Sequence, residues 1–194
     1  MNNYLRLDGV LILLVACVTL LFSPLLFAEG LSTYSEFPKS SKTEVIPFPI
    51  EFASDITLNG VEELVFLPGM YKQEKEDFFS YAFSWTHKPE KNQVLGKVEI
   101  QDFIASYYRG LYKAVTQGKE YEPAITIEWD DGKYTGQIKW IEPFVTNKEQ
   151  TLYFKGNQVN CEKTDELRWY FIVSPQNSSH PVWAELQSIK PKNC

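Results

Sequence analysis

The residues best suited to acid–base or metal chemistry are His87 and His180, the two histidines of the 194-residue chain. His87 ends an alternating, strand-like segment and His180 begins a predicted short helix, and functional side chains often lie at such ends. Neither has a second histidine at metal-ligand spacing, and the chain contains no His-Glu-x-x-His, Gly-x-Ser-x-Gly or glycine-rich phosphate motif. The sequence therefore assigns no catalytic residue, metal site or cofactor, and it predicts solvated, structural roles for both histidines.

Two carboxylate pairs, Glu62-Glu63 and Asp130-Asp131, could serve as acid and base only if both members faced one site. Neighbours on a strand point to opposite faces of the sheet, so neither pair meets that condition. Asp131 also has a simpler role in a turn, because Asp tolerates the backbone conformations that turns require. Ser80 lies in an aromatic segment without any nucleophile motif. We therefore assign no chemistry to these residues.

Aromatic residues are better candidates for binding, because small-molecule pockets are mainly apolar with few polar groups. Three of them, Trp129, Tyr134 and Trp140, belong to a segment in which Asp131-Gly132 separates two alternating runs. Asp-Gly at this place favours a hairpin with a two-residue turn. The sequence therefore predicts that these three aromatic residues lie on adjacent strands.

The predicted hairpin has a defined register, in which Trp129 faces Tyr134 and Ile125 faces Ile138. All large apolar residues then share one face: Ile125, Ile127, Trp129, Tyr134, Ile138 and Trp140. A slip by one residue would mix the two faces. We expect the apolar face to turn toward a helix, where Trp129, Tyr134 and Trp140 form either a sealed core or the wall of a ligand cavity.

A helical period replaces the strand period between residues 98 and 117. Arg109 and Lys113 lie late in this segment, acidic residues lie early, and Gly118 follows as a stop, as the helix dipole favours. Seven apolar residues fall on one face: Ile100, Phe103, Ile104, Tyr107, Leu111, Ala114 and Val115. The pattern predicts one long helix, with Gly110 allowing close approach to the sheet.

The rest of the pattern predicts strands, with further hairpins at Asn59-Gly60 and Gly156-Asn157 and an interior strand over residues 167–174. A short helix is expected after Ser179, which could cap it. The sequence thus predicts an α+β fold: an antiparallel sheet of about seven to eight strands curved around the long helix, with a short C-terminal helix. This order resembles that of cystatin-like rolls, a topological analogy that implies no function.

The first 28 residues have the pattern of an export signal, with a polar start, an apolar run from Gly9 to Ala28 and a small residue at its end. We predict cleavage after Ala28, a polar tether over residues 29–44 and a single domain over residues 45–194. The protein would then be periplasmic or secreted.

Two alternatives to cleavage remain open. The run from Gly9 to Ala28 is long enough to span a bilayer and to anchor the protein if it is not removed. The segment Leu14-Val15-Ala16-Cys17 resembles the lipidation motif of bacterial lipoproteins, although the chain stays apolar after Cys17.

Cysteine usage agrees with export. If Cys17 leaves with the signal, the mature chain keeps Cys161 and Cys194, and two cysteines in an oxidising compartment predict one disulfide between them. The alternative is a reactive or metal-binding thiol pair, for which the two residues lack Cys-x-x-Cys spacing.

Charge limits the choice of partners. The net charge is −6, and no Lys/Arg cluster offers a surface for phosphates, so we expect no nucleic-acid partner and contact with a membrane only through an uncleaved N-terminal segment. We expect a non-enzymatic domain of the cell envelope that binds a small apolar or carbohydrate ligand or an envelope protein. The alternatives are an exported hydrolase that uses His87 or His180 with a carboxylate, and a membrane-anchored scaffold.

Overall fold

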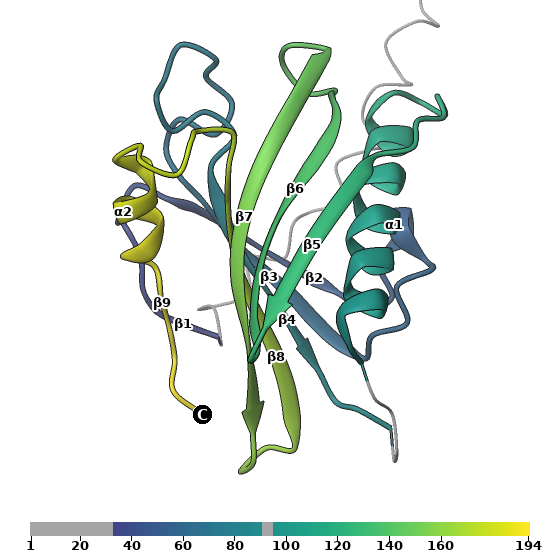
Figure 1. The fold of residues 1–194 in the computed structure, drawn as a ribbon, viewed down its shortest axis with the longest axis vertical. Coiled ribbons are helices and arrows are strands. Elements are labelled where there is room, and N and C mark those ends of the chain that lie inside the picture. Colours follow the sequence, from purple (N-terminus) through teal and green to yellow (C-terminus); the bar gives the residue numbers. More distant parts are fainter. Residues whose placement is uncertain (1–32, 91–94) are drawn as a thin grey trace, which may run out of the picture.

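The computed structural model of the chain describes residues 33–90 and 95–194 (Figure 1). The predicted export signal therefore lies outside the described residues. Within them, no helix has both the length and the apolar character that crossing a membrane would require.

The fold is mostly antiparallel sheet with few helices (Figure 1). Seven strands form the main sheet in the order β2-β3-β4-β8-β7-β6-β5, and β1 pairs with β9 in a separate two-stranded sheet. The strands are β1 (Tyr34–Glu36), β2 (Lys42–Pro47), β3 (Gly60–Phe66), β4 (Tyr81–His87), β5 (Ala124–Asp130), β6 (Lys133–Glu142), β7 (Lys148–Cys161), β8 (Glu166–Ser174) and β9 (Lys190–Pro191). The helices are α1 (Lys97–Val115), α2 (Val182–Gln187) and the short 3-10 helix η1 (Glu51–Ala53).

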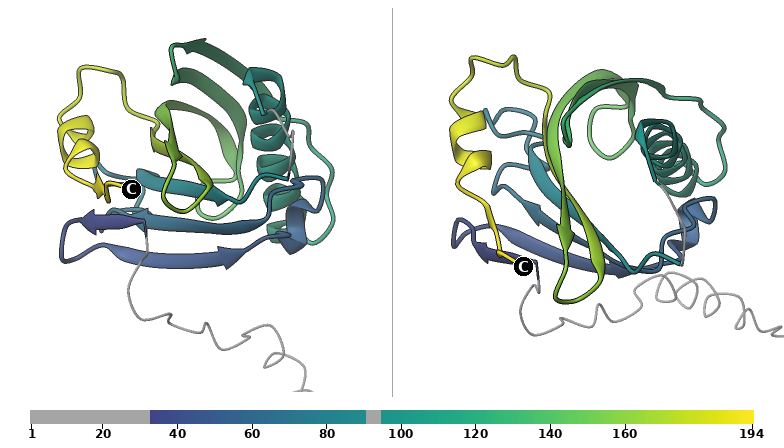
Figure 2. Two further views of the ribbon diagram at one scale, coloured as in Figure 1. Left: turned by 90° about the horizontal axis from the view of Figure 1, so that it is seen from below. Right: turned by 60° about the horizontal axis from the view of Figure 1, so that its bottom comes forward.

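The two longer helices lie on opposite sides of the main sheet (Figure 2). On one side, Ile100 and Ile104 of α1 pack in the larger core with inward residues of the strands, such as Trp169. On the other side, Leu186 of α2 packs in a smaller core with Val65. The predicted interior strand is confirmed, because β8 lies between β4 and β7 and contributes residues to both cores.

The hairpin register read from the sequence is confirmed, with Trp129 opposite Tyr134 and Ile125 opposite Ile138. Tyr134 and Trp140 are buried, but Trp129 is 52% exposed, so its expected place against the helix is wrong. The physical reason is its position: β5 is an edge strand, and Trp129 lies next to the turn, at the end of β5 that runs away from α1 (Figure 1).

The two other predicted hairpins are wrong. Gly60 begins β3, which pairs with β2 and β4 and not with the residues just before it. Gly156 lies inside β7, where a β-carbon would come within 2.3 Å of the Phe171 ring. The glycine at position 156 thus makes room for an aromatic neighbour across the sheet and does not turn the chain.

The described part of the predicted tether is folded. Thr33 and Tyr34 are buried, β1 pairs with β9, and β2 begins at Lys42 within the range expected to be a tether. These short segments have too few apolar residues to show a period, and their burial depends on partners far along the chain.

The predicted long helix corresponds to α1, which has 19 residues. Its buried face carries Tyr108 and Tyr112 in addition to four of the seven expected residues, while Leu111 is half-buried and Ala114 and Val115 are exposed. Gly110 permits a close approach as expected, but to η1 and not to the sheet, since a β-carbon there would lie 1.8 Å from the carbonyl oxygen of Phe52.

Cys161 and Cys194 form a disulfide, with their Cα atoms 5.1 Å apart. The bond ties the end of β7 to the residues that follow β9. It therefore closes a loop that contains β8 and α2.

We expect the double variant Cys161→Ser with Cys194→Ser to unfold more easily. Closing a loop of 33 positions stabilises the folded state by ~3–4 kcal/mol in the chain-entropy model. Urea denaturation without reductant should show this loss, and wild-type protein in reductant should match the variant. Equal midpoints for the variant and the oxidised wild type would contradict the expectation.

Candidate functional site

A pocket of about 190 Å³ lies between α1, η1 and the β2-β3-β4 side of the sheet, and we call it the aromatic pocket. Its lining is mainly apolar, with one carboxylate and several phenols. The lining residues are Glu44, Ile46, Phe52, Leu64, Phe66, Met70, Tyr71, Phe79, Tyr81, Tyr107, Leu111 and Phe144.

Five of the aromatic lining residues form a closed circuit of neighbouring rings, which we call the five-ring circuit. Its centroid distances are 6.4 Å for Phe66 to Tyr71, 5.9 Å for Tyr71 to Phe144, 6.1 Å for Phe144 to Phe79, 6.0 Å for Phe79 to Tyr81 and 6.0 Å for Tyr81 to Phe66. Tyr71 and Phe144 are 48% and 38% exposed, so they mark the mouth of the pocket.

Local backbone structure fixes the inner rings. Phe66 and Tyr81 are cross-strand partners at the ends of β3 and β4, so the sheet sets their separation. Phe79 adopts a φ of 52°, a conformation that a bulky residue rarely takes and that costs roughly 1–3 kcal/mol. Its backbone N–H donates to the Met70 carbonyl oxygen over 3.1 Å, which closes the loop between the two strands.

A buried carboxylate fixes the turn that carries Phe144. Glu142 is fully buried and accepts hydrogen bonds from the backbone N–H groups of Phe144, Val145 and Thr146, the last over 2.6 Å. The Thr146 hydroxyl donates to the same carboxylate over 2.7 Å. Charge-assisted hydrogen bonds of this kind are strong, so they hold the Phe144 ring at the mouth of the pocket.

Glu44 places a half-buried carboxylate in the pocket wall. It lies on β2 opposite Leu64, with its side chain on the α1 side of the sheet. Burial raises the pKa of Glu44 above its ordinary value, because a charged carboxylate loses hydration there. Burial, and then the charge of Glu44, likewise raise the pKa of Tyr71.

A second carboxyl group, that of Glu62, lies behind the pocket wall and is 1% exposed. Burial raises the pKa of Glu62 to about 8, although interactions with Trp85 and Tyr107 favour the charged form. The Trp85 indole donates to Oε1 over 3.0 Å, whereas Oε2 has no hydrogen-bond partner of good geometry among the described residues. Glu62 therefore holds a proton at neutral pH, beside the Tyr107 ring that lines the pocket.

The residues predicted to bind a ligand do not line the aromatic pocket. Tyr134 and Trp140 are sealed in the core, where Tyr134 donates to Gln158 and Trp140 donates to Gln150, each over 3.0 Å. Trp129 lies apart from them on the exposed end of β5. No observation tests a ligand-binding role for these three residues, which stays a prediction.

The expectation that His87 is solvated is wrong, because its side chain is 1% exposed and its Nδ1 accepts the backbone N–H of Asn59 over 2.9 Å. His180 is half-buried and shares a surface hollow with Asp77 and Glu185. Its Nδ1 accepts the backbone N–H of Val182 over 3.2 Å.

The two histidines do not share a site. His87 is the last residue of β4, whereas His180 lies beside the loop that precedes β4. A strand of seven residues is about 20 Å long, so the two histidines lie near opposite ends of β4. Within residues 33–90 and 95–194, no group of three or more His, Cys, Asp or Glu side chains could hold a metal ion.

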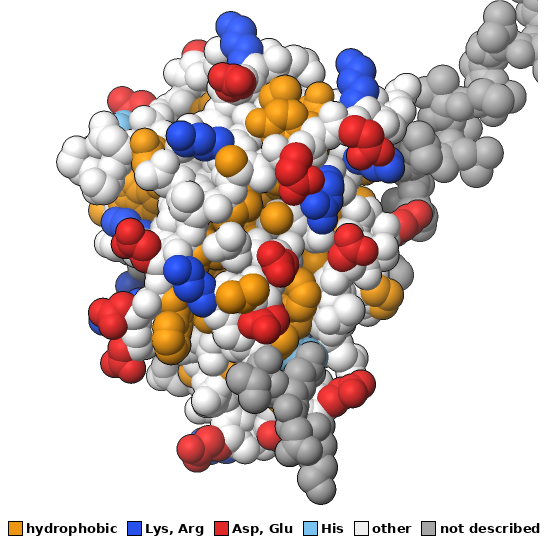
Figure 3. All heavy atoms as spheres, turned by 45° about the vertical axis from the view of Figure 1, so that its right-hand side comes forward, with side chains coloured by type: hydrophobic (Ala, Val, Ile, Leu, Met, Phe, Trp, Pro, Cys, Tyr) orange, Lys and Arg blue, Asp and Glu red, His pale blue; other side chains and the backbone are white. Residues whose placement is uncertain are grey.

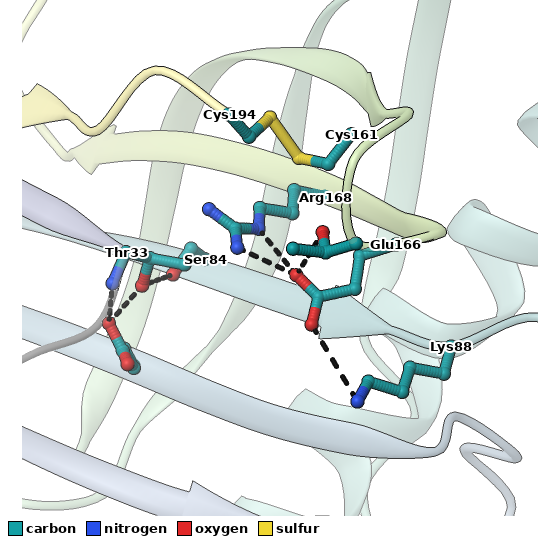
Figure 4. Close-up of polar contacts among 9 residues, drawn as sticks. Thr33, Ser84, Lys88, Cys161, Glu166, Arg168 and Cys194 are labelled. Atoms are coloured by element: carbon teal, nitrogen blue, oxygen red, sulfur yellow. Dashed lines mark hydrogen bonds and ion pairs between the residues drawn. A yellow bond between two sulfur atoms is a disulfide. The ribbon is translucent and has the colours of Figure 1, made fainter.

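Two polar clusters on the side of the sheet away from the aromatic pocket hold segments of the fold together (Figure 4). Glu63 accepts hydrogen bonds from the backbone N–H and the hydroxyl of Thr33, and that hydroxyl lies 3.0 Å from the Ser84 hydroxyl. Glu166 pairs with Arg168 over 2.6 Å, near the disulfide. These contacts fasten the first described residues and the start of β8 to the sheet.

The face shown in Figure 3 carries interspersed acidic and basic side chains with hydrophobic patches between them. No large area of a single charge appears on this face. Such a surface gives no sign of a polyanion-binding site on this side of the molecule.

Comparison of the chain with protein families, with curated proteins and with solved structures finds no match. The function of the chain is therefore inferred from the geometry of the site.

We expect Glu62 to make the protein less stable as the pH rises. The folded state keeps the proton up to a pKa of about 8, whereas the unfolded chain releases it near 4.5, so the free energy of unfolding falls between these values by up to ~1.4 kcal/mol per pH unit. Glu62→Gln should remove this slope and be more stable than the wild type at pH 8.

Urea denaturation at several pH values between 5 and 8 measures this slope. Glu128→Gln, at an exposed position on β5, is the matched control and should behave like the wild type. Parallel slopes for Glu62→Gln and the wild type would show that Glu62 does not hold its proton in the folded protein.

Proposed function

We propose that this protein binds a small molecule in the aromatic pocket, as a non-enzymatic domain of the cell envelope. The observation that carries the proposal is an open volume of about 190 Å³ whose wall includes the five-ring circuit. A core built only for stability would fill such a space with side chains, since protein interiors are close-packed.

The size of the pocket limits the bound group. An engineered apolar cavity of about 150 Å³ holds one benzene molecule, so a pocket of about 190 Å³ takes one ring or one compact branched alkyl group. A larger ligand would have to extend past Tyr71 and Phe144 into solvent.

The rigidity of the pocket supports binding over plain packing. Phe79 is held in a costly backbone conformation, and Glu142 uses its buried carboxylate to hold the turn of Phe144. The rings of Phe79 and Phe144 both lie in the pocket wall. A site that is rigid before binding loses less entropy when the ligand arrives.

The proposed location is the periplasm or the outside of the cell, supported by the disulfide and by the export pattern of residues 1–28. An uncleaved anchor from Gly9 to Ala28 is the alternative. We further interpret residues 45–194 as a single domain, a roll around α1 with cystatin-like order, to which β1 adds a strand. The mass of the mature protein distinguishes cleavage after Ala28 from an intact anchor.

We expect small apolar alcohols, such as 3,3-dimethylbutan-1-ol and benzyl alcohol, to bind the wild type. Leu111→Trp should weaken binding at least tenfold, because the larger side chain enters the pocket from α1. Val98→Trp, at an exposed position on the same helix, should bind like the wild type. Ligand-observed NMR titration measures all three proteins, and equal binding by both variants, or none by the wild type, would refute the proposal.

A further inference from the structure

We infer that the aromatic pocket selects a methylated ammonium group, with the five-ring circuit facing the cation and Glu44 as its counter-ion. This inference rests on the proposed binding function and names the chemical class of the ligand. The recognised group would be a trimethylammonium head, whether it belongs to a free small molecule or to a lipid headgroup.

The aromatic content of the wall suits a cation. The centroids of neighbouring rings in the five-ring circuit lie between 5.9 and 6.4 Å apart, and all five rings line the pocket. A cation in the pocket would therefore lie beside several rings at once, and a cation–π contact reaches ~6 Å. Aromatic cages bind quaternary ammonium ligands through such contacts.

The charge of the pocket has the sign that this ligand requires. Glu44 is the charged residue among the lining residues, which include no Lys or Arg. Its carboxylate is half-buried and loses hydration, and the pocket wall holds no basic side chain beside it, so a cation in the pocket would compensate it. An anionic ligand would be repelled, and a neutral one would leave Glu44 uncompensated.

The scarcity of free acceptors favours a methylated over a primary ammonium group. A primary ammonium carries three N–H donors that each need an acceptor when they leave water. The polar groups of the lining are the Glu44 carboxylate and the hydroxyls of three tyrosines, of which Tyr81 shares a hydrogen bond with Tyr108, and the remaining lining residues offer no side-chain oxygen or nitrogen acceptor. A trimethylammonium group has no donors, and its methyl groups suit the ring faces.

The position of the mouth indicates how the ligand would enter. Tyr71 and Phe144 are the exposed members of the five-ring circuit, so the cation would enter beside these two rings while the rest of its molecule stays outside. This arrangement fits both choline itself and a phosphocholine headgroup.

The decisive measurement compares choline with its neutral isostere, 3,3-dimethylbutan-1-ol, by NMR titration of the full chain. The two differ only in the central atom and its charge. We expect choline to bind at least tenfold more tightly, and ethanolamine at least tenfold more weakly than choline. Vesicles of phosphatidylcholine, tested against vesicles of phosphatidylglycerol, show whether a lipid headgroup is also accepted.

Variants at the mouth and in the wall test the assigned roles. Tyr71→Leu, Phe144→Leu and Glu44→Gln should each weaken choline binding at least fivefold, and by a larger factor than they weaken the binding of 3,3-dimethylbutan-1-ol. These positions are exposed or half-buried, so the variants should fold, and thermal denaturation verifies that each variant is folded.

The outcomes separate this inference from the proposal on which it rests. If the neutral isostere binds as tightly as choline, or ethanolamine binds as tightly as choline, the methylated-ammonium inference is overturned while small-molecule binding stands. If neither choline nor the alcohol binds, both fail. Binding of choline alone supports a free ligand, and binding of phosphatidylcholine vesicles as well supports a lipid headgroup.

Discussion

The central strands of the sheet must be covered on both faces, and the rest of the molecule is arranged around this constraint. β4 and β8 place aromatic or aliphatic side chains on each side, so neither side can face water without exposing apolar area. α1 and η1 cover one side, while α2 and the β1-β9 pair cover the other. The small β1-β9 sheet is therefore part of the cover of the second core.

Glu62 and Glu63 are neighbours on β3 and point to opposite sides of the sheet, so the same type of side chain lies in two different environments. Glu63 is buried and accepts hydrogen bonds from the backbone N–H and the hydroxyl of Thr33, which take the place of water around its carboxyl group. Glu62, one position earlier, faces the aromatic core, where burial raises its pKa to about 8 although Trp85 and Tyr107 favour the charged form. The difference follows from what each side of the sheet supplies, because an isolated buried charge is far more costly than a neutral acid.

Local patterns predicted local structure well and distant packing poorly. The Asp131-Gly132 hairpin was predictable because register follows from a period of two and a specific turn. Gly156 looked the same in sequence, but its role depends on the Phe171 ring across the sheet, which no local pattern reveals. The exposure of Trp129 likewise depends on where β5 lies relative to α1.

The aromatic pocket was missed for the same reason, since its lining comes from segments far apart in the chain. One signal was present: Glu62 alternates with Leu64 and Phe66 on an apolar face, where a carboxyl group is out of place. Phe79 gave no such signal, because its unusual backbone conformation is set by the loop that closes around it.

The pairing of β1 with β9 also has a consequence for the order of folding. A hydrogen bond joins residues 155 positions apart in this small sheet, so it can form only after nearly all of the described chain is available. Contacts of such high sequence separation form slowly, because the entropy of closing the loop is lost before the contact is gained. The second core would thus form late. In a chain that crosses a membrane with its N-terminal end first, the α2 side of the sheet would stay uncovered until the residues of β9 had crossed.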